Sequence, residues 1–124
     1  VKKVSKAVEA TDPLWMAWRT MKEGDSKILP VMSQQKIIGM VSAQDIVRAS
    51  DHNGGQTMTV REAMSLDPLI VNQDTPIVDV VQAMIKKDQQ HAIVVDGGAQ
   101  IVGIFSWSEA FMYFLERNNL KNPA

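Results

Sequence analysis

The strongest constraint on this chain is that its sequence runs twice through the same pattern. The segment Val8–Leu14 aligns with Val71–Ile77 at an offset of 63 residues, and each segment carries a proline at the same place. The apolar residues that follow are spaced i, i+3, i+4 and i+7, which predicts an amphipathic helix in each copy. These residues are Leu14, Ala17, Trp18 and Met21 in the first copy, and Ile77, Val80, Val81 and Met84 in the second. We expect Asp12 and Thr75 to cap these helices, with proline at the first helical position.

After these helices both copies turn to extended chain, with short β-branched runs separated by turn-prone residues. A second helix then follows in each copy. The aligned pairs are Ile28–Met32 with Ala92–Val95, Ser33–Lys36 with Asp96–Gln100, Ile37–Ser42 with Ile101–Ser106, and Ala43–Ala49 with Trp107–Arg117. Each repeat therefore reads as strand, helix, strand, strand, helix, an α+β fold class built from α/β-like repeats.

The sequence divides into repeat one at 1–50, a linker at 51–59 and repeat two at 60–124. The linker is polar and glycine-bearing, and Val60–Met64 reads as a short helical lead-in to repeat two. A unit of about 50 residues buries too little surface to be comfortably stable alone. We therefore expect the repeats to be related by a pseudo-twofold axis and to form one compact module. Val1, where an initiator methionine would stand, slightly favours a fragment or a trimmed chain.

Composition excludes several classes of function. The 13 basic and 14 acidic side chains nearly cancel and are interspersed, so non-specific nucleic-acid binding has no electrostatic driving force. Cysteine is absent, which excludes disulfides, thiolate zinc sites and cysteine nucleophiles, and fits a cytoplasmic protein. Two isolated histidines, His52 and His91, make no transition-metal cluster. No apolar run is long enough to suggest a membrane span, so we expect no membrane contact by this segment.

The order of these motifs resembles the CBS domain pair, also called a Bateman module. The resemblance rests on a hydrophobic-Pro-Val run, then hydrophobic-Gly-hydrophobic-hydrophobic-Ser/Thr, then Asp three residues later, and it covers about Val4 to Leu115. The matching segments are Ile28–Val31 with Ile38–Ile46, and Ala92–Val95 with Val102–Ala110. Such pairs bind AMP, ADP, ATP, NAD or S-adenosylmethionine in clefts between the repeats, in some cases with magnesium. The resemblance implies no required cofactor, and control of a covalently attached or separate enzyme, channel or transporter.

In repeat one, Ser42 and Asp45 match the ribose-contacting motif of the family. A carboxylate in the first turn of a helix can accept hydrogen bonds from two vicinal hydroxyls, and the same helix end favours phosphate. The residues also fit a capping box, and both roles can coexist. Lys27 lies where the family often places a cation facing phosphate, with a solvated loop lysine as the alternative. The remaining predicted contacts are Ile28, Leu29, Pro30 and Met40.

Repeat two departs from the family pattern at two positions. Glu109 replaces the aspartate, and Ile93 stands where repeat one has Pro30. These departures predict that repeat one contributes the better ribose site. His91 lies near the place of Lys27, with a packed or exposed histidine as the alternative. The ligand-binding residues predicted for repeat two are Val71, His91, Ile93, Ile104, Ser106 and Glu109.

Two aromatic regions suggest contacts with another chain. Trp18 falls on the apolar stripe and is expected to be buried, whereas Trp15 lies off the stripe and suggests a subunit contact. The apolar segment Phe111–Leu115 is expected to meet another chain in part, and in the family the first helices line a dimer face. The resemblance thus implies a homodimer built on helix faces.

We therefore interpret the chain as a non-catalytic, ligand-sensing module. The alternative is a structural dimerisation scaffold whose clefts are filled by side chains such as Met40 and Phe105. A small enzyme would need a P-loop, a nucleophile elbow or another converging polar motif, and the sequence carries none.

Overall fold

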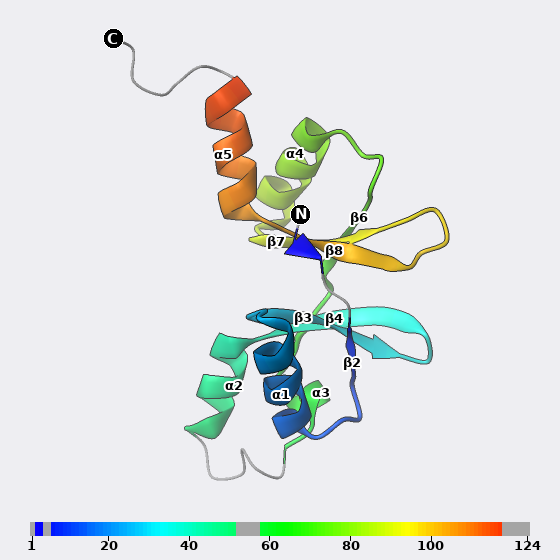
Figure 1. Ribbon diagram of the computed structural model, residues 1–124, viewed down its shortest axis with the longest axis vertical. Coiled ribbons are helices and arrows are strands. Elements are labelled where there is room, and N and C mark those ends of the chain that lie inside the picture. The colour runs from blue at the N-terminus through cyan, green and yellow to red at the C-terminus, as the bar shows by residue number, and fades with distance from the viewer. Residues whose placement is uncertain (1, 4–5, 52–57, 118–124) are drawn as a thin grey trace. The chain divides into compact units, whose positions relative to one another are not determined.

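The computed structural model describes residues 2–3, 6–51 and 58–117. Its elements follow the order expected from the sequence, with strand, helix, strand, strand, helix occurring twice (Figure 1). The expected linker falls mostly outside the described residues, as does His52. The elements are β1 (Lys2–Lys3), β2 (Val8–Glu9), α1 (Leu14–Gly24), β3 (Ile28–Ser33), β4 (Lys36–Ser42), α2 (Ala43–Ser50), α3 (Val60–Ala63), β5 (Ser65–Leu66), β6 (Leu69–Asn72), α4 (Ile77–Lys87), β7 (His91–Val95), β8 (Ile101–Ser106) and α5 (Trp107–Arg117).

The chain folds into two compact units. The N-terminal unit spans residues 4–68 and contains the sheet β2-β3-β4-β5, in which β2 and β3 are parallel and the other pairs antiparallel. Helices α1 and α2 lie on one face of this sheet (Figure 1). The core between them contains Leu14, Ala17, Leu29, Val31 and Val41.

The C-terminal unit repeats this arrangement with residues 69–117 and the strand β1. Its sheet has the order β1-β8-β7-β6, with β6 and β7 parallel, and it is covered on one face by α4 and α5 (Figure 1). The core contains Val80, Met84, Ala92, Val94 and Phe105. The fold class expected from the sequence is therefore confirmed.

The short strands at the start of each repeat are exchanged between the repeats. Strand β5 lies near the start of repeat two, yet it pairs with β4 of repeat one through Leu66 opposite Gly39. Strand β1 lies at the start of repeat one, yet it pairs with β8 of repeat two through Lys3 opposite Gly103. The packing units thus differ from the sequence repeats by these lead-in segments.

Gly39 shows why the Gly of the repeated motif is needed in the N-terminal unit. A Cβ atom on Gly39 would collide with the backbone carbonyl oxygen of Ser65 in the adjacent strand β5. Its φ is not positive, so the requirement is for space rather than for an unusual backbone conformation.

The helix starts differ from the sequence prediction. Pro13 and Pro76 are extended and occupy the N-cap positions, so the helices begin one residue later than expected. Neither helix receives a side-chain cap. Instead, the Asp12 carboxylate accepts a hydrogen bond from the Glu9 backbone N–H at 2.9 Å, so it stabilises the turn that leads from β2.

Trp18 was expected to be buried, and this prediction is wrong. Its side chain is 53% exposed, close to the 51% of Trp15. The buried side of α1 is centred on Ala17. Met16 and Thr20 are half-buried, so the buried face of the helix lies toward one edge of the apolar stripe. Trp18 lies at the other edge, and the Lys22 ammonium is 5.1 Å from its ring centroid.

Candidate ligand-binding site

The start of α2 and the start of β3 form a polar cluster in the N-terminal unit. Ile28 is paired with Ser42 across the two strands, and the Lys27 carbonyl accepts a hydrogen bond from the Ala43 backbone N–H at 2.8 Å. These contacts bring Lys27, Ile28, Ser42 and Asp45 to one end of the sheet. The Lys27 side chain is exposed.

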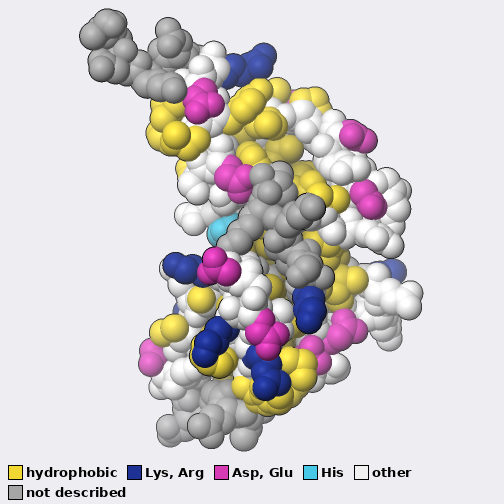
Figure 2. Space-filling model, in the orientation of Figure 1, with side chains coloured by type: hydrophobic (Ala, Val, Ile, Leu, Met, Phe, Trp, Pro, Cys, Tyr) yellow, Lys and Arg dark blue, Asp and Glu magenta, His cyan; other side chains and the backbone are white. Residues whose placement is uncertain are grey.

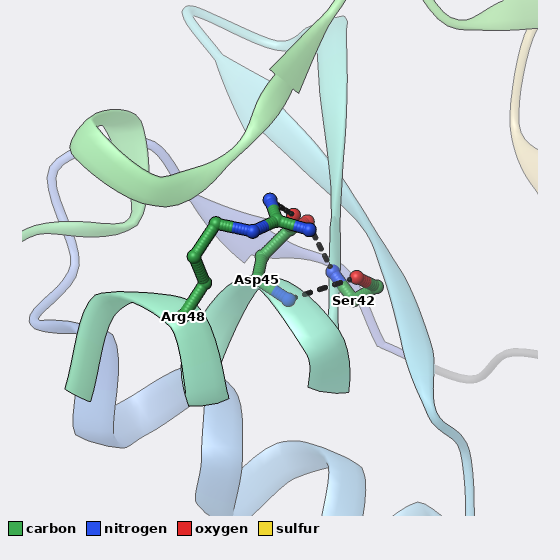
Figure 3. Close-up of polar contacts among 3 residues, drawn as sticks. All are labelled: Ser42, Asp45 and Arg48. Carbon is green, nitrogen blue, oxygen red and sulfur yellow. Dashed lines mark hydrogen bonds and ion pairs between the residues drawn. The ribbon is translucent and has the colours of Figure 1, made fainter. Parts of the chain in front are cut away.

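Ser42 and Asp45 form the capping box predicted from their spacing (Figure 3). The Asp45 carboxylate accepts a hydrogen bond from the Ser42 backbone N–H at 2.8 Å, and the Ser42 hydroxyl accepts one from the Asp45 backbone N–H at 3.1 Å. Asp45 is only 9% exposed. A buried carboxylate is therefore held in one orientation at the N-terminus of α2, where the helix dipole favours negative charge.

Arg48 joins this cluster and was missed in the sequence analysis. Its guanidinium Nη1 lies 3.4 Å from Asp45 Oδ1, the carboxylate oxygen that does not accept from Ser42 (Figure 3). The Arg48 side chain is largely exposed. The spacing of three residues on one helix was the signal available in the sequence. The cluster thus presents the Asp45 carboxylate next to the guanidinium of Arg48, which stands on a long and largely exposed side chain.

Ser26 was also missed. It is buried, and its hydroxyl donates a hydrogen bond to the Ile28 carbonyl at 2.8 Å. This hydrogen bond holds the backbone where β3 begins. A serine in the turn after a helix gives little indication of such a role from sequence alone.

The predicted apolar contacts of repeat one lie on both faces of the sheet. Leu29 packs in the core below the helices. Because side chains alternate along a strand, Ile28 and Pro30 lie on the opposite face. Pro30 is paired with Met40, and both are buried. The structure thus brings Ile28, Pro30 and Met40 to one face and separates them from Leu29.

The C-terminal unit carries an equivalent cluster with different side chains. His91 is paired with Ser106, and Ile93 with Ile104, as Ile28 and Pro30 are paired with Ser42 and Met40. The Gln90 carbonyl accepts a hydrogen bond from the Trp107 backbone N–H at 2.8 Å. Gln90 is therefore the counterpart of Lys27, and His91 is the counterpart of Ile28, the residue next to Lys27.

The capping contacts of Glu109 are longer than those of Asp45. The Glu109 carboxylate accepts from the Ser106 backbone N–H at 3.3 Å, and the Ser106 hydroxyl accepts from the Glu109 backbone N–H at 3.3 Å. The extra methylene of glutamate does not give a tighter capping box here. Beside this cluster, burial lowers the pKa of His91 below its ordinary value, because a charged imidazole loses hydration there.

Val71, a predicted ligand contact, and Phe105, a side chain expected to fill a cleft in the scaffold alternative, both lie on the helix side of their sheet. Phe105 belongs to the core, and Val71 packs against that core. Both also line an apolar cavity of about 160 Å³ between the sheet and the start of α4. Phe105 thus packs in the core of its own unit. The scaffold alternative named Phe105 and Met40 as side chains that fill the clefts, and only Met40 remains for that role.

Two further findings concern the described segments only. No three His, Cys, Asp or Glu side chains among them gather into a group that could hold a metal ion. None of the helices in residues 6–51 and 58–117 is both long enough and apolar enough to cross a membrane.

The family model named CBS domain matches residues 2–52 and 60–116, which together cover most of the chain. This chain belongs to the CBS domain family. The two matches coincide with the two repeats, so the chain carries a tandem pair. CBS pairs are known regulatory, ligand-binding modules, and they are typically regulatory rather than catalytic.

Similar proteins agree with this assignment. An uncharacterized protein of Methanocaldococcus jannaschii, MJ1232, is 30% identical over 77 residues, which is 62% of this chain and 25% of that protein. An uncharacterized 17.7 kDa protein of Acidianus ambivalens is 29% identical over 91 residues, covering 73% of this chain and 55% of that protein. The chain therefore spans a quarter and about half of the length of these two relatives.

Among solved structures, the fold is similar to the CBS domain of a bacterial CNNM/CorC family Mg²⁺ transporter in complex with ATP. The TM-score is 0.73 at 18% sequence identity, with 89% of this chain and 78% of that chain covered. At this identity the likeness shows a shared fold.

Proposed function

We propose that this chain is a regulatory module that binds an adenosine-containing nucleotide, namely AMP, ADP, ATP, NAD or S-adenosylmethionine, in the clefts between its CBS repeats. The observation that carries the proposal is the Asp45 carboxylate, which is buried and oriented at the N-terminus of α2 with the Arg48 guanidinium beside it. The ATP complex of the structurally similar transporter domain supports the choice of ligand class.

The chemistry of this cluster suits a nucleoside phosphate. One Asp45 oxygen is occupied by the Ser42 backbone N–H, and the other faces Arg48 at 3.4 Å. A ribose diol can donate to the oxygen that faces Arg48, because the exposed arginine side chain can turn aside. The released guanidinium, together with Lys27, then offers positive charge to phosphate. Magnesium would enter with the polyphosphate of the nucleotide rather than through a protein site.

The two clefts are proposed to be unequal. The counterpart of Lys27 is Gln90, and the residue three positions after Glu109 is Met112 rather than an arginine. At the two positions that carry cations in the N-terminal cluster, the C-terminal cluster therefore has uncharged side chains, while burial holds His91 toward its neutral form by lowering its pKa. We therefore assign phosphate recognition to the cluster of Asp45 and leave a weaker ribose contact to Glu109.

We further propose that the module forms a homodimer through its helix faces. Large apolar side chains are exposed on α1 and on α5, and hydrophobic surface lies over these helices in Figure 2. On α1, the guanidinium of Arg19 and the ammonium of Lys22 lie over the rings of Trp15 and Trp18. The large exposed apolar side chains are Trp15 and Trp18 on α1, and Trp107, Phe111, Met112 and Phe114 on α5.

The partner controlled by the module is proposed to be an attached or separate enzyme or transporter. The absence of cysteine supports a cytoplasmic location, and no catalytic role is assigned to any residue. The alternative remains a dimerisation scaffold without a small-molecule ligand, for which buried Met40 would fill the space beside Pro30.

A thermal unfolding series tests this proposal. AMP, ADP, ATP, NAD and S-adenosylmethionine are added separately, with GMP and GTP as controls for the base. A ligand present at 100 times its Kd adds about 2.7 kcal/mol to the free energy of unfolding when it binds only the folded state. An increase in Tm with adenosine ligands alone supports sensing. A flat response over the whole adenosine series, together with a dimer in sedimentation, supports the scaffold.

A further inference from the structure

The ion pair between Asp45 and Arg48 occupies the carboxylate oxygen that the proposed ribose contact needs. Oδ2 of Asp45 accepts a hydrogen bond from the Ser42 backbone N–H at 2.8 Å, and Oδ1 lies 3.4 Å from Nη1 of Arg48 (Figure 3). The Asp45 side chain is 10% exposed, whereas that of Arg48 is 71% exposed. The carboxylate is therefore held in place by the capping box, and the arginine is the partner that can move when a ligand arrives.

A ligand that offers only hydroxyl groups to this carboxylate must first break the ion pair. Ribose hydroxyls can donate hydrogen bonds to Oδ1 of Asp45, but they carry no net charge. The Coulomb attraction between two unit charges is therefore lost when they replace the guanidinium. The displaced guanidinium of Arg48 returns to solvent without an anion beside it. The ion pair thus opposes the binding of unphosphorylated adenosine.

A phosphate on the same nucleoside replaces the attraction that is lost. The planar guanidinium can donate two parallel hydrogen bonds to phosphate oxygens, and it bears the opposite charge. Arg48 follows Asp45 by three residues on one helix, so the displaced guanidinium remains within one helical turn of the ribose contact. Lys27 adjoins the same helix end, since its carbonyl accepts from the Ala43 backbone N–H at 2.8 Å. A nucleotide therefore exchanges one ion pair for another.

A ligand with positive charge at the place of the phosphate meets the opposite situation. S-adenosylmethionine carries a sulfonium cation on the ribose carbon to which AMP, ADP, ATP and NAD attach phosphate. The displaced guanidinium of Arg48 and the ammonium of Lys27 would then lie near a charge of their own sign. The two cations of this cluster therefore disfavour S-adenosylmethionine as well as adenosine.

The C-terminal unit supplies the natural comparison for Arg48. Glu109 accepts from the Ser106 backbone N–H as Asp45 accepts from that of Ser42, and Met112 stands where the N-terminal unit has Arg48. A methionine is unbranched and carries no charge, so it neither competes for a carboxylate nor attracts phosphate. Replacing Arg48 by methionine therefore gives the N-terminal cluster the residue that the other unit carries at this position.

We propose that Arg48 determines the specificity of the N-terminal cluster, which selects phosphorylated adenosine nucleotides over adenosine and S-adenosylmethionine. This inference rests on the proposed function and narrows its ligand class. Without ligand, Arg48 neutralises Asp45 and opposes the entry of a neutral nucleoside. When a nucleotide binds, Arg48 leaves Asp45 for the phosphate, so the ribose contact and the phosphate contact form together. Arg48 thus acts in opposite directions on the two classes of ligand.

The variant Arg48→Met tests this proposal with AMP, adenosine and S-adenosylmethionine as separate ligands. NMR titration measures each affinity from the backbone amide signals of Ser42 and Asp45, which report on this cluster separately from Ser106 and Glu109. The affinity for AMP is expected to fall about tenfold, because a charge-assisted contact with phosphate is lost. The affinity for adenosine is expected to rise about two- to fivefold, because no ion pair has to be broken. The affinity for S-adenosylmethionine should also rise.

Two further variants serve as controls. Arg48→Lys keeps the positive charge, so it should restore much of the preference for AMP over adenosine that Arg48→Met removes. Arg61→Met removes an exposed arginine of α3, and it should leave both affinities within about twofold of the parent values, because distant surface charges are screened by salt. Melting curves without ligand check that each variant is folded.

Three results would overturn the proposal. If Arg48→Met weakens the binding of adenosine and AMP to the same extent, Arg48 supports the ribose contact or the helix and does not select for phosphate. If neither affinity changes, Arg48 takes no part in recognition. If the parent chain binds AMP, ATP and adenosine at neither cluster, the proposed function itself fails and this inference fails with it.

Discussion

In the N-terminal unit, α3 closes the core beside α1 and an Asp–Arg pair stands at the start of α2. In the C-terminal unit the same topology surrounds an apolar cavity, and Glu109 at the start of α5 is followed three residues later by Met112 rather than by an arginine. The strand pairing is nevertheless the same in both units, including the irregularity that follows Val31 in β3 and Val94 in β7. The two units therefore share the same backbone arrangement, but they differ beside their first helices, α1 and α4, and in the polar clusters at the starts of α2 and α5.

This difference has a physical reason. Strand register is strongly specified because one face of each sheet is buried under helices, and a shift of one residue would expose that face. The polar residues at the helix starts carry less of the folding energy, since a capping contact contributes about 0.5–2 kcal/mol. The two repeats therefore share their strand register, whereas the polar clusters at the helix starts can differ in the ligands that they bind.

The largest expected effect tests whether α3 completes the N-terminal unit. We expect Val60→Asp to lower the free energy of unfolding by at least about 3 kcal/mol, because it buries an unpaired carboxylate in the core. The matched control is Val78→Asp on exposed α4, for which a change within about 0.5 kcal/mol is expected. Urea unfolding measures both. Equal effects would show that Val60 does not close a core.

The second prediction sharpens the comparison of the two polar clusters. Asp45→Asn keeps the size and the capping ability of the side chain but removes the charged acceptor, so nucleotide affinity should fall about ten- to a hundredfold. Glu109→Gln should change affinity much less. Calorimetric titration with AMP and ATP measures both variants, and melting curves without ligand separate lost binding from lost capping. A larger loss with Glu109→Gln would reverse our assignment of the sites.

Much of the fold could be predicted from the sequence because its determinants are local. Apolar spacing predicted α1 and α4, and the aligned turns predicted the strands to within about two residues. The capping box at Ser42 followed from its spacing alone. The family resemblance rested on these same local motifs in their repeated order.

The features that the sequence did not reveal depend on contacts between distant segments. The exchange of β1 and β5 is a matter of strand pairing, which periodicity does not specify. Trp18 is exposed because the elements that pack on α1 cover the other edge of its stripe. The sequence placed His91 only near Lys27, and the pairing of His91 with Ser106 makes it the counterpart of Ile28, the residue after Lys27.

A third, smaller effect compares the two hairpins. Gln35 in the N-terminal unit has a φ of 67°, and Ala99 in the C-terminal unit has a φ of 64°, in the left-handed region that favours glycine. We expect Gln35→Gly and Ala99→Gly each to raise the free energy of unfolding by about 0.5–1 kcal/mol. Gly97→Ala is the control, since Gly97 lacks a positive φ and has open space around its Cβ position. If either glycine variant were less stable than the parent chain, the left-handed turn would not be strained.

The smallest expected effect uses a titratable difference between the paired strands of the two units, His91 in place of Ile28 opposite the serine. Burial lowers the pKa of His91, so the unfolded chain binds this proton more tightly than the folded protein does. Stability from this residue is therefore fully retained above the unfolded pKa and decreases as the pH falls toward the folded pKa. Between about pH 7 and pH 5, Tm should fall more for the parent chain than for His91→Ile, which carries the residue found in the other unit. Because His52 is present in both proteins, its titration cancels in the comparison. Parallel Tm curves would show that His91 is equally hydrated in both states, and a steeper fall for His91→Ile would mean that a partner stabilises the charged imidazole.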